Sequence, residues 1–290
     1  MWGLSLLLVA IEASLPLVPE SSASPPVCAC DAAFGCNGHE LRAESAHFVV
    51  TSYREGPCAR YVASRCENTR SQLRCDCLGR SEPLAWEPKC QIVLHSSQSS
   101  YRRATGQGSG QTVGSSLINI RSGRVSERRI DLLATDAKQA LSAVPHELTH
   151  VLLADVFPAS PPPRWAEEGL ALLADPADKR ARHARDLRRA LQTNTTLPLA
   201  TFFTNADYPA ARDRAVFYAQ SMSLAEYLVA LDSPQRFVEF VELGERVGHA
   251  AALRRIYDIQ GLAELENKWL RYAASQSVAP VVVPVSQREL

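Results

Sequence analysis

Two absences narrow the classes of protein to which this chain can belong. The sequence has no excess of either charge, since 31 Lys and Arg residues balance 31 Asp and Glu residues. Without a basic surface, we expect no nucleic-acid partner. It also has no apolar run of the roughly 20 residues that a membrane-spanning helix needs; the longest covers residues 2–11. With 46% hydrophobic residues over 290 positions, the composition is that of a packed globular protein without a transmembrane span.

The first apolar run has the features of a secretory signal peptide. Small residues follow it, and Ser21, Ser22 and Ala23 form a suitable cleavage site. No Lys or Arg precedes the run and Glu12 lies at its end, so a buried N-terminal helix is the alternative. We expect residues 1–23 to be a signal peptide, and the mature protein to be exported to the periplasm, the cell envelope or the extracellular space.

Cysteine is absent after position 90. The eight cysteines all lie between residues 28 and 90, and an even, clustered set behind a signal peptide is typical of a disulfide framework. A structural zinc site is the alternative, but the Cys-x-Cys pairs at 28/30 and 75/77 are too closely spaced for the common zinc knuckle. We therefore predict disulfide bonds, with Cys66 to Cys90 as the first choice of pair.

Apolar patterning divides the rest of the chain into a strand-rich part and a helical part. Runs rich in branched residues at 47–51, 90–94, 116–120 and 129–133 predict strands, the last two joined as a hairpin through Ser122 and Gly123. From residue 136 to about residue 274 the pattern is helical, so the predicted fold class is α+β. We expect a signal peptide (1–23), a Cys- and Pro-rich leader (24–45), a globular domain (46–277) with a sheet lobe (46–135) and a helical lobe (136–277), and an extended tail (278–290).

The motif His-Glu-Leu-Thr-His, which begins at His146, points to metal chemistry. Residues four positions apart on a helix lie on the same face, about one turn apart, so His146 and His150 can bind one zinc ion. Glu147 can reach a water at the metal as general base without binding the metal itself. Pro145 suits the first turn of a helix, and the apolar residues 151–153 can pack that helix into a core. The alternative is a pair of core histidines that flank a glutamate.

A catalytic zinc site needs a third protein ligand and a water. The segment Trp-Ala-Glu-Glu-Gly-Leu-Ala, which begins at Trp165, follows the first motif after a proline-rich connection that ends the first helix. A second helix over this segment can present a carboxylate to the two histidines, and we assign Glu168 as the third ligand. The alternative is that Glu167 and Glu168 only form an acidic first turn that complements the helix dipole.

Together these two motifs resemble those of the gluzincin metallopeptidases, the group with peptidase MA-like domains that includes thermolysin and the zinc aminopeptidases. The resemblance implies a zincin-like fold: a twisted mixed sheet with helices, a mainly helical C-terminal lobe, and the active-site helix at their junction. It implies one catalytic zinc ion and a tyrosine that stabilises the oxyanion, at Tyr218 of the predicted helix 215–231; a core tyrosine is the alternative. It also implies that residues 116–120 bind the substrate main chain as an added strand.

Parts of the family pattern are missing from this sequence. The aminopeptidases hold the amino terminus of the substrate with a Gly-x-Met-Glu-Asn segment, which does not occur before Pro145, and this favours an endopeptidase. Tyr218 lacks the Lys-Gly that follows the corresponding tyrosine in the aminopeptidases. Leu172 stands where thermolysin has an Asp that supports a zinc-binding His, and Asp175 is the candidate for that role at His146.

We therefore predict zinc-dependent hydrolysis of a peptide or protein substrate. His146, His150 and Glu168 are the predicted metal ligands. Glu147 is the predicted general base and Tyr218 the hydrogen-bond donor to the oxyanion. Two alternatives stay open: a catalytically idle, zinc-containing module that binds in the cell envelope, and a zinc hydrolase of a non-peptide amide. A complete general base argues against the idle module, because a structural metal site has no use for one.

Overall fold

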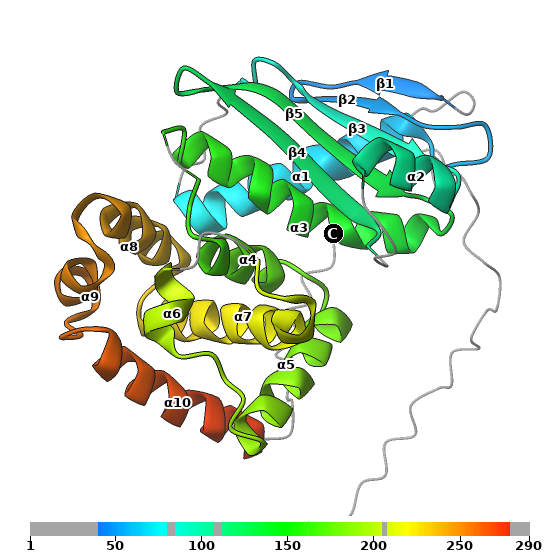
Figure 1. Cartoon of the computed structure of the whole chain (residues 1–290). Helices are drawn as coiled ribbons and strands as arrows, with labels where there is room; N and C mark the ends of the chain where they lie inside the picture. The colour runs from blue at the N-terminus through cyan, green and yellow to red at the C-terminus, as the bar shows by residue number, and fades with distance from the viewer. Residues whose placement is uncertain (1–39, 80–84, 107–111, 160, 205–207, 279–290) are drawn as a thin grey trace, which may run out of the picture.

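The computed structural model describes residues 40–79, 85–106, 112–159, 161–204 and 208–278. They form a mixed sheet and a set of α-helices (Figure 1), so the predicted combination of sheet and helix is confirmed. The predicted signal peptide, most of the predicted leader and all but the first residue of the tail lie outside the described residues. The export and domain-boundary predictions for those segments therefore stay predictions.

Five strands form one sheet in the order β1-β2-β3-β5-β4. The three inner strands run parallel to one another, and the two edge strands run antiparallel to their neighbours. The predicted hairpin is confirmed: Ser122 and Gly123 join its strands with φ values of 51° and 69°, which suits the tight turns that connect twisted antiparallel strands. The strands are β1 (Arg42–Glu44), β2 (Phe48–Thr51), β3 (Cys90–His95), β4 (Gly114–Arg121) and β5 (Arg124–Leu133).

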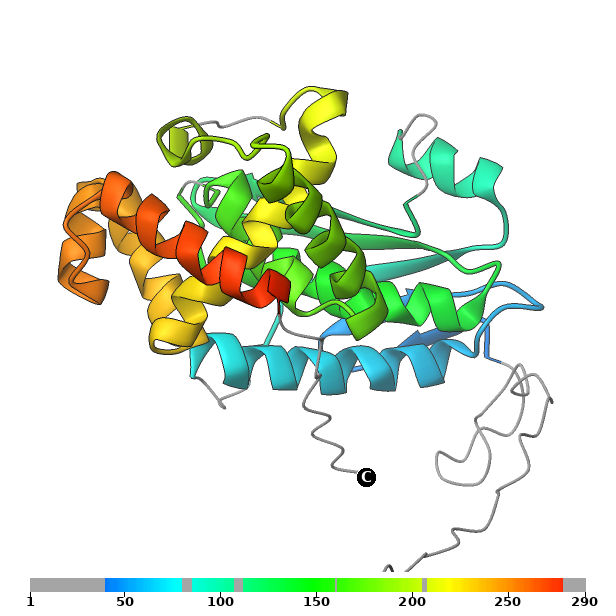
Figure 2. The same ribbon diagram turned by 90° about the horizontal axis from the view of Figure 1, so that it is seen from below.

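Two long helices, α1 (Ala59–Leu78) and α3 (Ala137–Val156), pack side by side against the sheet (Figures 1 and 2). Branched and aromatic residues of the inner strands meet apolar residues of both helices in one buried cluster. The short helix α2 (Gln98–Thr105) connects β3 to β4. The cluster includes Phe48, Val50, Ile92, Ile130 and Leu132 from the sheet, Val62 and Cys66 from α1, and Leu148 and Val151 from α3. This core anchors the face of α3 opposite to the metal-binding side chains.

Helix α3 begins where the helical pattern of the sequence was predicted to begin, at residue 136, and not near Pro145. Its N-cap is Asp136, whose side chain accepts a hydrogen bond of 2.9 Å from the backbone N–H of Gln139. Pro145 therefore lies inside the helix and not in its first turn, and that prediction was wrong. The turns before the proline are held because Ala140 and Val144 are buried in the sheet-lobe core, and this packing offsets the backbone hydrogen bond that a proline cannot make.

The helical lobe packs around a second core (Figure 1). Its largest buried members are aromatic: Trp165, Phe202, Phe237, Phe240 and Trp269. No helix in the described part of the chain is both long and apolar enough to cross a bilayer. The helices of the lobe are α4 (Arg164–Leu173), α5 (Ala177–Gln192), α6 (Leu199–Thr204), α7 (Arg214–Leu231), α8 (Pro234–Val247), α9 (His249–Tyr257) and α10 (Leu262–Val278), with a 3-10 turn at Ala211–Asp213.

The predicted disulfide pair is present as two thiols. Cys66 of α1 and Cys90 of β3 are free cysteines buried in the same cluster. Burial raises the pKa of Cys90 to about 12, which makes this thiol a poor nucleophile at neutral pH. Cys75 and Cys77 are also free, while Cys28, Cys30 and Cys36 lie outside the described residues. The disulfide framework as a whole stays a prediction.

Candidate metal centre

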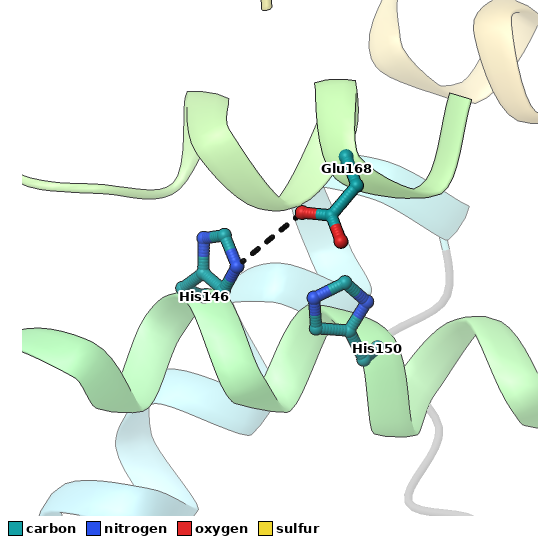
Figure 3. A group of neighbouring side chains, drawn as sticks. All are labelled: His146, His150 and Glu168. Carbon is teal, nitrogen blue, oxygen red and sulfur yellow. Dashed lines mark ion pairs between the residues drawn. The ribbon is translucent and has the colours of Figure 1, made fainter. Parts of the chain in front are cut away.

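The two histidines of the first motif project from one face of α3. Because they are four positions apart on the helix, their rings lie one above the other, with ring centroids separated by 5.0 Å. Both point toward α4, which runs beside α3 (Figure 3). Helix α4 lies on the side of α3 away from the sheet (Figure 1). His150 is buried and His146 is partly exposed.

Glu168 of α4 completes a group of three possible metal ligands. Its Oε2 atom lies 3.7 Å from Nε2 of His146, and its carboxylate points between the two rings (Figure 3). One donor atom from each of His146, His150 and Glu168 lies within 4.8 Å of the others. The structure therefore brings the three sequence-predicted ligands together.

The donor atoms and the local charge both fit a zinc ion. Two imidazole nitrogens and one carboxylate oxygen are a ligand set typical of catalytic zinc. The carboxylates of Glu147, Glu167 and Glu168 lie near His150, and the guanidinium of Arg164 lies near two of them, Glu167 and Glu168. With neutral imidazoles, three negative charges against one positive charge leave an excess of two, which a divalent cation would cancel.

The pKa of His150 shows the same excess of negative charge. Burial by itself lowers this pKa, but the hydrogen bond to Glu167 and the charges of the surrounding carboxylates outweigh burial and raise it to about 9. A site that binds a proton this firmly stabilises positive charge at the position where a metal ion would bind.

Each histidine has a carboxylate beside its Nδ1 atom. Nδ1 of His150 lies 3.0 Å from Oε1 of Glu167 in a buried hydrogen bond. Nδ1 of His146 lies 3.3 Å from Oδ2 of Asp175, although among the described residues this nitrogen has no partner of good hydrogen-bond geometry. A carboxylate at Nδ1 leaves Nε2 free for a metal and fixes the ring. Asp175 thus occupies the place that the sequence predicted for it.

Each of these two carboxylates in turn has its own cation. Nη1 of Arg164 donates a hydrogen bond of 2.9 Å to Oε2 of Glu167, and Nζ of Lys179 lies 3.4 Å from Oδ1 of Asp175. The carboxyl pKa values of Glu167 and Asp175 are both lowered: burial opposes the shift, but the histidine and the cation beside each carboxylate outweigh it. Both groups therefore stay ionised at neutral pH.

The adjacent residues Glu167 and Glu168 have different tasks. Both are buried, with exposed fractions of 9% and 4%, so they are more than acidic residues in an exposed first turn. Glu168 faces the two rings, whereas Glu167 holds His150 from the outside. The sequence did not predict this role of Glu167; the available signal was its place one residue before the predicted ligand, on a neighbouring face of the same helix.

The predicted general base lies against the start of β4. Glu147 is 7% exposed, and a Cβ atom placed on Gly114 would lie 2.6 Å from its Oε1 atom and 2.9 Å from its Cγ atom. A glycine at this position is thus what makes room for the carboxylate. Sequence patterns did not single out Gly114, because the contact joins two segments far apart in the chain.

Two tyrosines line the site. Burial and the negative charge of Glu168 raise the pKa of the half-buried Tyr218 phenol to about 12. Tyr208, which the sequence did not predict, donates a hydrogen bond of 2.5 Å to Oε1 of Glu168. The rings of Tyr208 and Tyr218 lie 6.3 Å apart. Tyr208 stands in a segment without helical or strand periodicity, so no pattern marked it.

A second glycine controls how closely α7 approaches α4. A Cβ atom on Gly169 would lie 2.6 Å from the backbone oxygen of Ser221 and 2.8 Å from Cβ of Ala225. The two helices can therefore touch only if residue 169 has no side chain. This contact brings α7, which carries Tyr218, next to the helix that carries Glu168.

All five sequence-predicted site residues thus lie in one region, contributed by α3, α4 and α7. Comparison of the chain with protein-family models, with curated proteins and with solved structures gives no match. The functional inference therefore depends on the geometry and chemistry of these side chains.

Proposed function

We propose that the chain is a zinc-dependent endopeptidase of the gluzincin type, with a zincin-like fold, that acts on a peptide or protein after export. The observation that carries the proposal is the group His146, His150 and Glu168 with the buried carboxylate of Glu147 beside it. The arrangement of a sheet lobe and a helical lobe that meet at α3 also agrees with such a fold.

The number of ligands favours catalysis over a structural role. Structural zinc sites are closed by four protein ligands, whereas catalytic sites use three and leave a position for water or substrate. The group described above offers three donors. Glu147 is next to it, and a site that serves only to stabilise the fold would gain nothing from a buried carboxylate that is not one of its ligands.

The side chains can divide the reaction among them. When bound, zinc would polarise the scissile carbonyl and lower the pKa of the attacking water. Glu147 would accept a proton from that water and pass it to the leaving amine. Tyr218 stays protonated at neutral pH because its pKa is raised to about 12, so its hydroxyl can donate to the oxyanion. His150 and His146 keep their orientation through Glu167 and Asp175.

The sheet provides a place for a peptide main chain. Strand β4 is an edge strand of the described sheet and begins at Gly114, next to Glu147. An extended peptide can hydrogen-bond to such an edge as an added strand. The side chains of Leu117 and Ile120 on this strand are 47% and 37% exposed and could contact apolar side chains of a substrate. These features favour a peptide over a small non-peptide amide.

The proposal can be tested with the purified full-length chain, by metal analysis and by cleavage of a peptide library. We expect one zinc ion per chain and cleavage within peptides. Glu147→Gln should retain the zinc and lose at least about 100-fold in activity, because the amide cannot accept the proton. Glu242→Gln on the exposed face of α8 is the matched control and should behave as wild type. A chain that binds zinc but cleaves no peptide would refute the proposal in favour of a binding module, and a chain without zinc would refute it altogether.

A further inference from the structure

Arg164, the first residue of α4, contacts the supporting residues of two different metal ligands. Its Nη1 atom donates a hydrogen bond of 2.9 Å to Oε2 of Glu167, whose other oxygen holds His150. The central carbon of its guanidinium lies 5.1 Å from the ring centroid of Tyr208, whose hydroxyl donates to Glu168. Arg164 is therefore connected to His150 through Glu167 and to Glu168 through Tyr208.

We propose that Arg164 is a positioning residue that holds two of the three metal ligands at once: His150 through Glu167, and Glu168 through Tyr208. The inference rests on the proposed function, because it concerns the same zinc site. It adds that the positions of two ligands depend on a residue that contacts neither the metal ligands nor a substrate.

The first branch depends on charge. Glu167 is buried among other carboxylates, and a buried carboxylate without a cation is strongly destabilised. Arg164 is the cation that pairs with it. Without the guanidinium, we expect the carboxylate of Glu167 to turn away from the repulsion of Glu168 and toward solvent. His150 would then lose the acceptor on Nδ1 that fixes its ring.

The second branch depends on shape. The hydroxyl of Tyr208 donates a hydrogen bond to Oε1 of Glu168. The other carboxylate oxygen, Oε2, is then the one that faces Nε2 of His146. Tyr208 itself is 42% exposed, so the burial of its ring is not enough to hold it. The Tyr208 ring lies between the guanidinium of Arg164 and the ring of Phe217, whose centroid is 6.2 Å from its own. A cation above an aromatic face is attracted to it, and this contact would keep the hydroxyl on Glu168.

Arginine is the residue type that can serve both branches. Its planar guanidinium can donate within its plane to a carboxylate while its face stacks on an aromatic ring. A lysine ammonium can keep the ion pair with Glu167 but cannot stack on Tyr208 in the same way. Arg164→Lys should therefore separate the two branches.

The third ligand provides an internal comparison. His146 is supported by Asp175 and, through it, by Lys179. Among the contacts of the described residues, none joins these two side chains to Arg164 or Tyr208. If Arg164 acts through Glu167 and Tyr208, the effect of Arg164→Ala on zinc affinity should not be additive with the effects of substitutions at those two residues. It should add independently to the effect of Lys179→Ala, since substitutions without shared partners are additive.

The experiment measures the zinc Kd of full-length variants by competition with a chromophoric chelator at one fixed pH. We expect Arg164→Ala to weaken zinc binding about 10- to 100-fold, the range typical of residues that orient metal ligands. The zinc Kd of Arg164→Lys should lie between those of Arg164→Ala and wild type. Tyr208→Phe should weaken binding in the wild-type background, and it should add less than about threefold in the Arg164→Ala background, because there the two changes remove the same contact.

Two further measurements separate positioning from a general loss of stability. The visible spectrum of the cobalt-substituted protein depends on ligand geometry, so Arg164→Ala and Tyr208→Phe should change it, whereas a variant that is merely less stable would keep it. The matched control is Arg212→Ala. The side chain of Arg212 is 86% exposed and is paired only with its neighbour Asp213 in the described residues, so this variant should keep both the zinc affinity and the cobalt spectrum of wild type.

The outcomes distinguish this inference from the proposed function. If wild type binds one zinc ion and Arg164→Ala binds it within about threefold as tightly, with an unchanged cobalt spectrum, Arg164 does not position the ligands. The proposed function would then still stand. If Arg164→Ala does not fold, Arg164→Lys and Tyr208→Phe decide, and wild-type affinity in both overturns the inference. If the wild-type chain binds no zinc, the inference and the proposed function fail together.

Discussion

A methyl group added at Gly114 should displace the general base without touching a metal ligand. The backbone of Gly114 is outside the left-handed region, so an alanine can adopt it without strain. Its Cβ atom, however, would lie 2.6 Å from Oε1 of Glu147, 2.9 Å from Cγ of Glu147 and 3.1 Å from Cβ of Ala143. Because Ala143 belongs to the rigid first half of α3, the carboxylate is the part that must move.

The size of this displacement follows from the contact distances. Non-bonded heavy atoms in a packed interior sit about 3.5 Å apart or more, so Oε1, now 2.6 Å from the new methyl position, must move by about 0.9 Å. A misplacement of about 1 Å costs roughly 100-fold in an enzymatic rate when the displaced group must meet a reacting atom. We therefore expect Gly114→Ala to lower kcat/KM about 100-fold and to leave zinc stoichiometry and affinity unchanged.

The assay is steady-state cleavage of a peptide identified with wild type, together with the zinc Kd and a thermal unfolding curve. Gly244→Ala is the matched control, because its new methyl group would also overlap a side chain, that of His249 at 2.8 Å, but in the α8–α9 region away from the site. The control should retain wild-type kinetics. A folded Gly114→Ala protein with kcat/KM within about threefold of wild type would show that the position of the Glu147 carboxylate does not limit the reaction.

Three other predictions test separate parts of the site. Tyr218→Phe should lower kcat about 100- to 1,000-fold with zinc content unchanged, as expected for a donor to the oxyanion, and steady-state kinetics that match wild type would make Tyr218 a core residue. Glu167→Ala should weaken zinc binding about 10- to 100-fold, and Glu168→Ala should weaken it more because it removes a ligand; equal zinc retention by both after the same chelator challenge would place the third ligand elsewhere. In natively exported protein, mass measurement without reductant should show a loss of about 2 Da per disulfide, or about 8 Da for four, and eight titratable thiols would contradict the framework.

Local patterns were sufficient for four of the five strands of the described sheet and for placing the two histidines on one face of a helix. The predicted hairpin was correct because Ser122 and Gly123 meet the requirement of a tight turn for positive φ. His146 and His150 were predicted as a pair because helical spacing alone puts them on one face. Asp175 was also placed correctly, beside His146. The hairpin and the histidine pair depend on residues close together in the chain, whereas Asp175 was a candidate only through the resemblance to thermolysin.

The start of α3 shows where a local rule fails. Proline is common in the first turn of a helix, and this led to the wrong prediction that Pro145 lies in the first turn of α3, although the helical pattern was predicted from residue 136. Packing of Ala140 and Val144 against the sheet extends the helix back to Ala137. Tertiary contacts thus outweighed the preference of a single residue.

The residues that the sequence did not predict share one property: each acts through a partner from another segment. Gly114 makes room for Glu147 of a different element, and Tyr208 reaches Glu168 from a segment without regular structure. Only one of the two contacts of Arg164 could be predicted from the sequence. Its ion pair with Glu167 has helical i, i+3 spacing, but its contact with Tyr208 joins two distant segments. Such pairs become visible only when the chain is folded.

The glycine that follows Glu168 shows how the metal ligands and the proposed oxyanion donor depend on one contact. Glu168 must lie on the face of α4 that looks toward α3, and the next residue then lies on a face turned toward α7. Any side chain at position 169 would meet the backbone oxygen of Ser221 at 2.6 Å, and backbone cannot yield as a flexible side chain can. It would therefore push α7 outward and carry Tyr218 away from the ligands, while His146, His150 and Glu168 on α3 and α4 kept their places. The Glu-Gly pair thus serves two proposed functions that can fail separately: its first residue supplies a proposed metal ligand, and its second sets the distance of the proposed donor to the oxyanion.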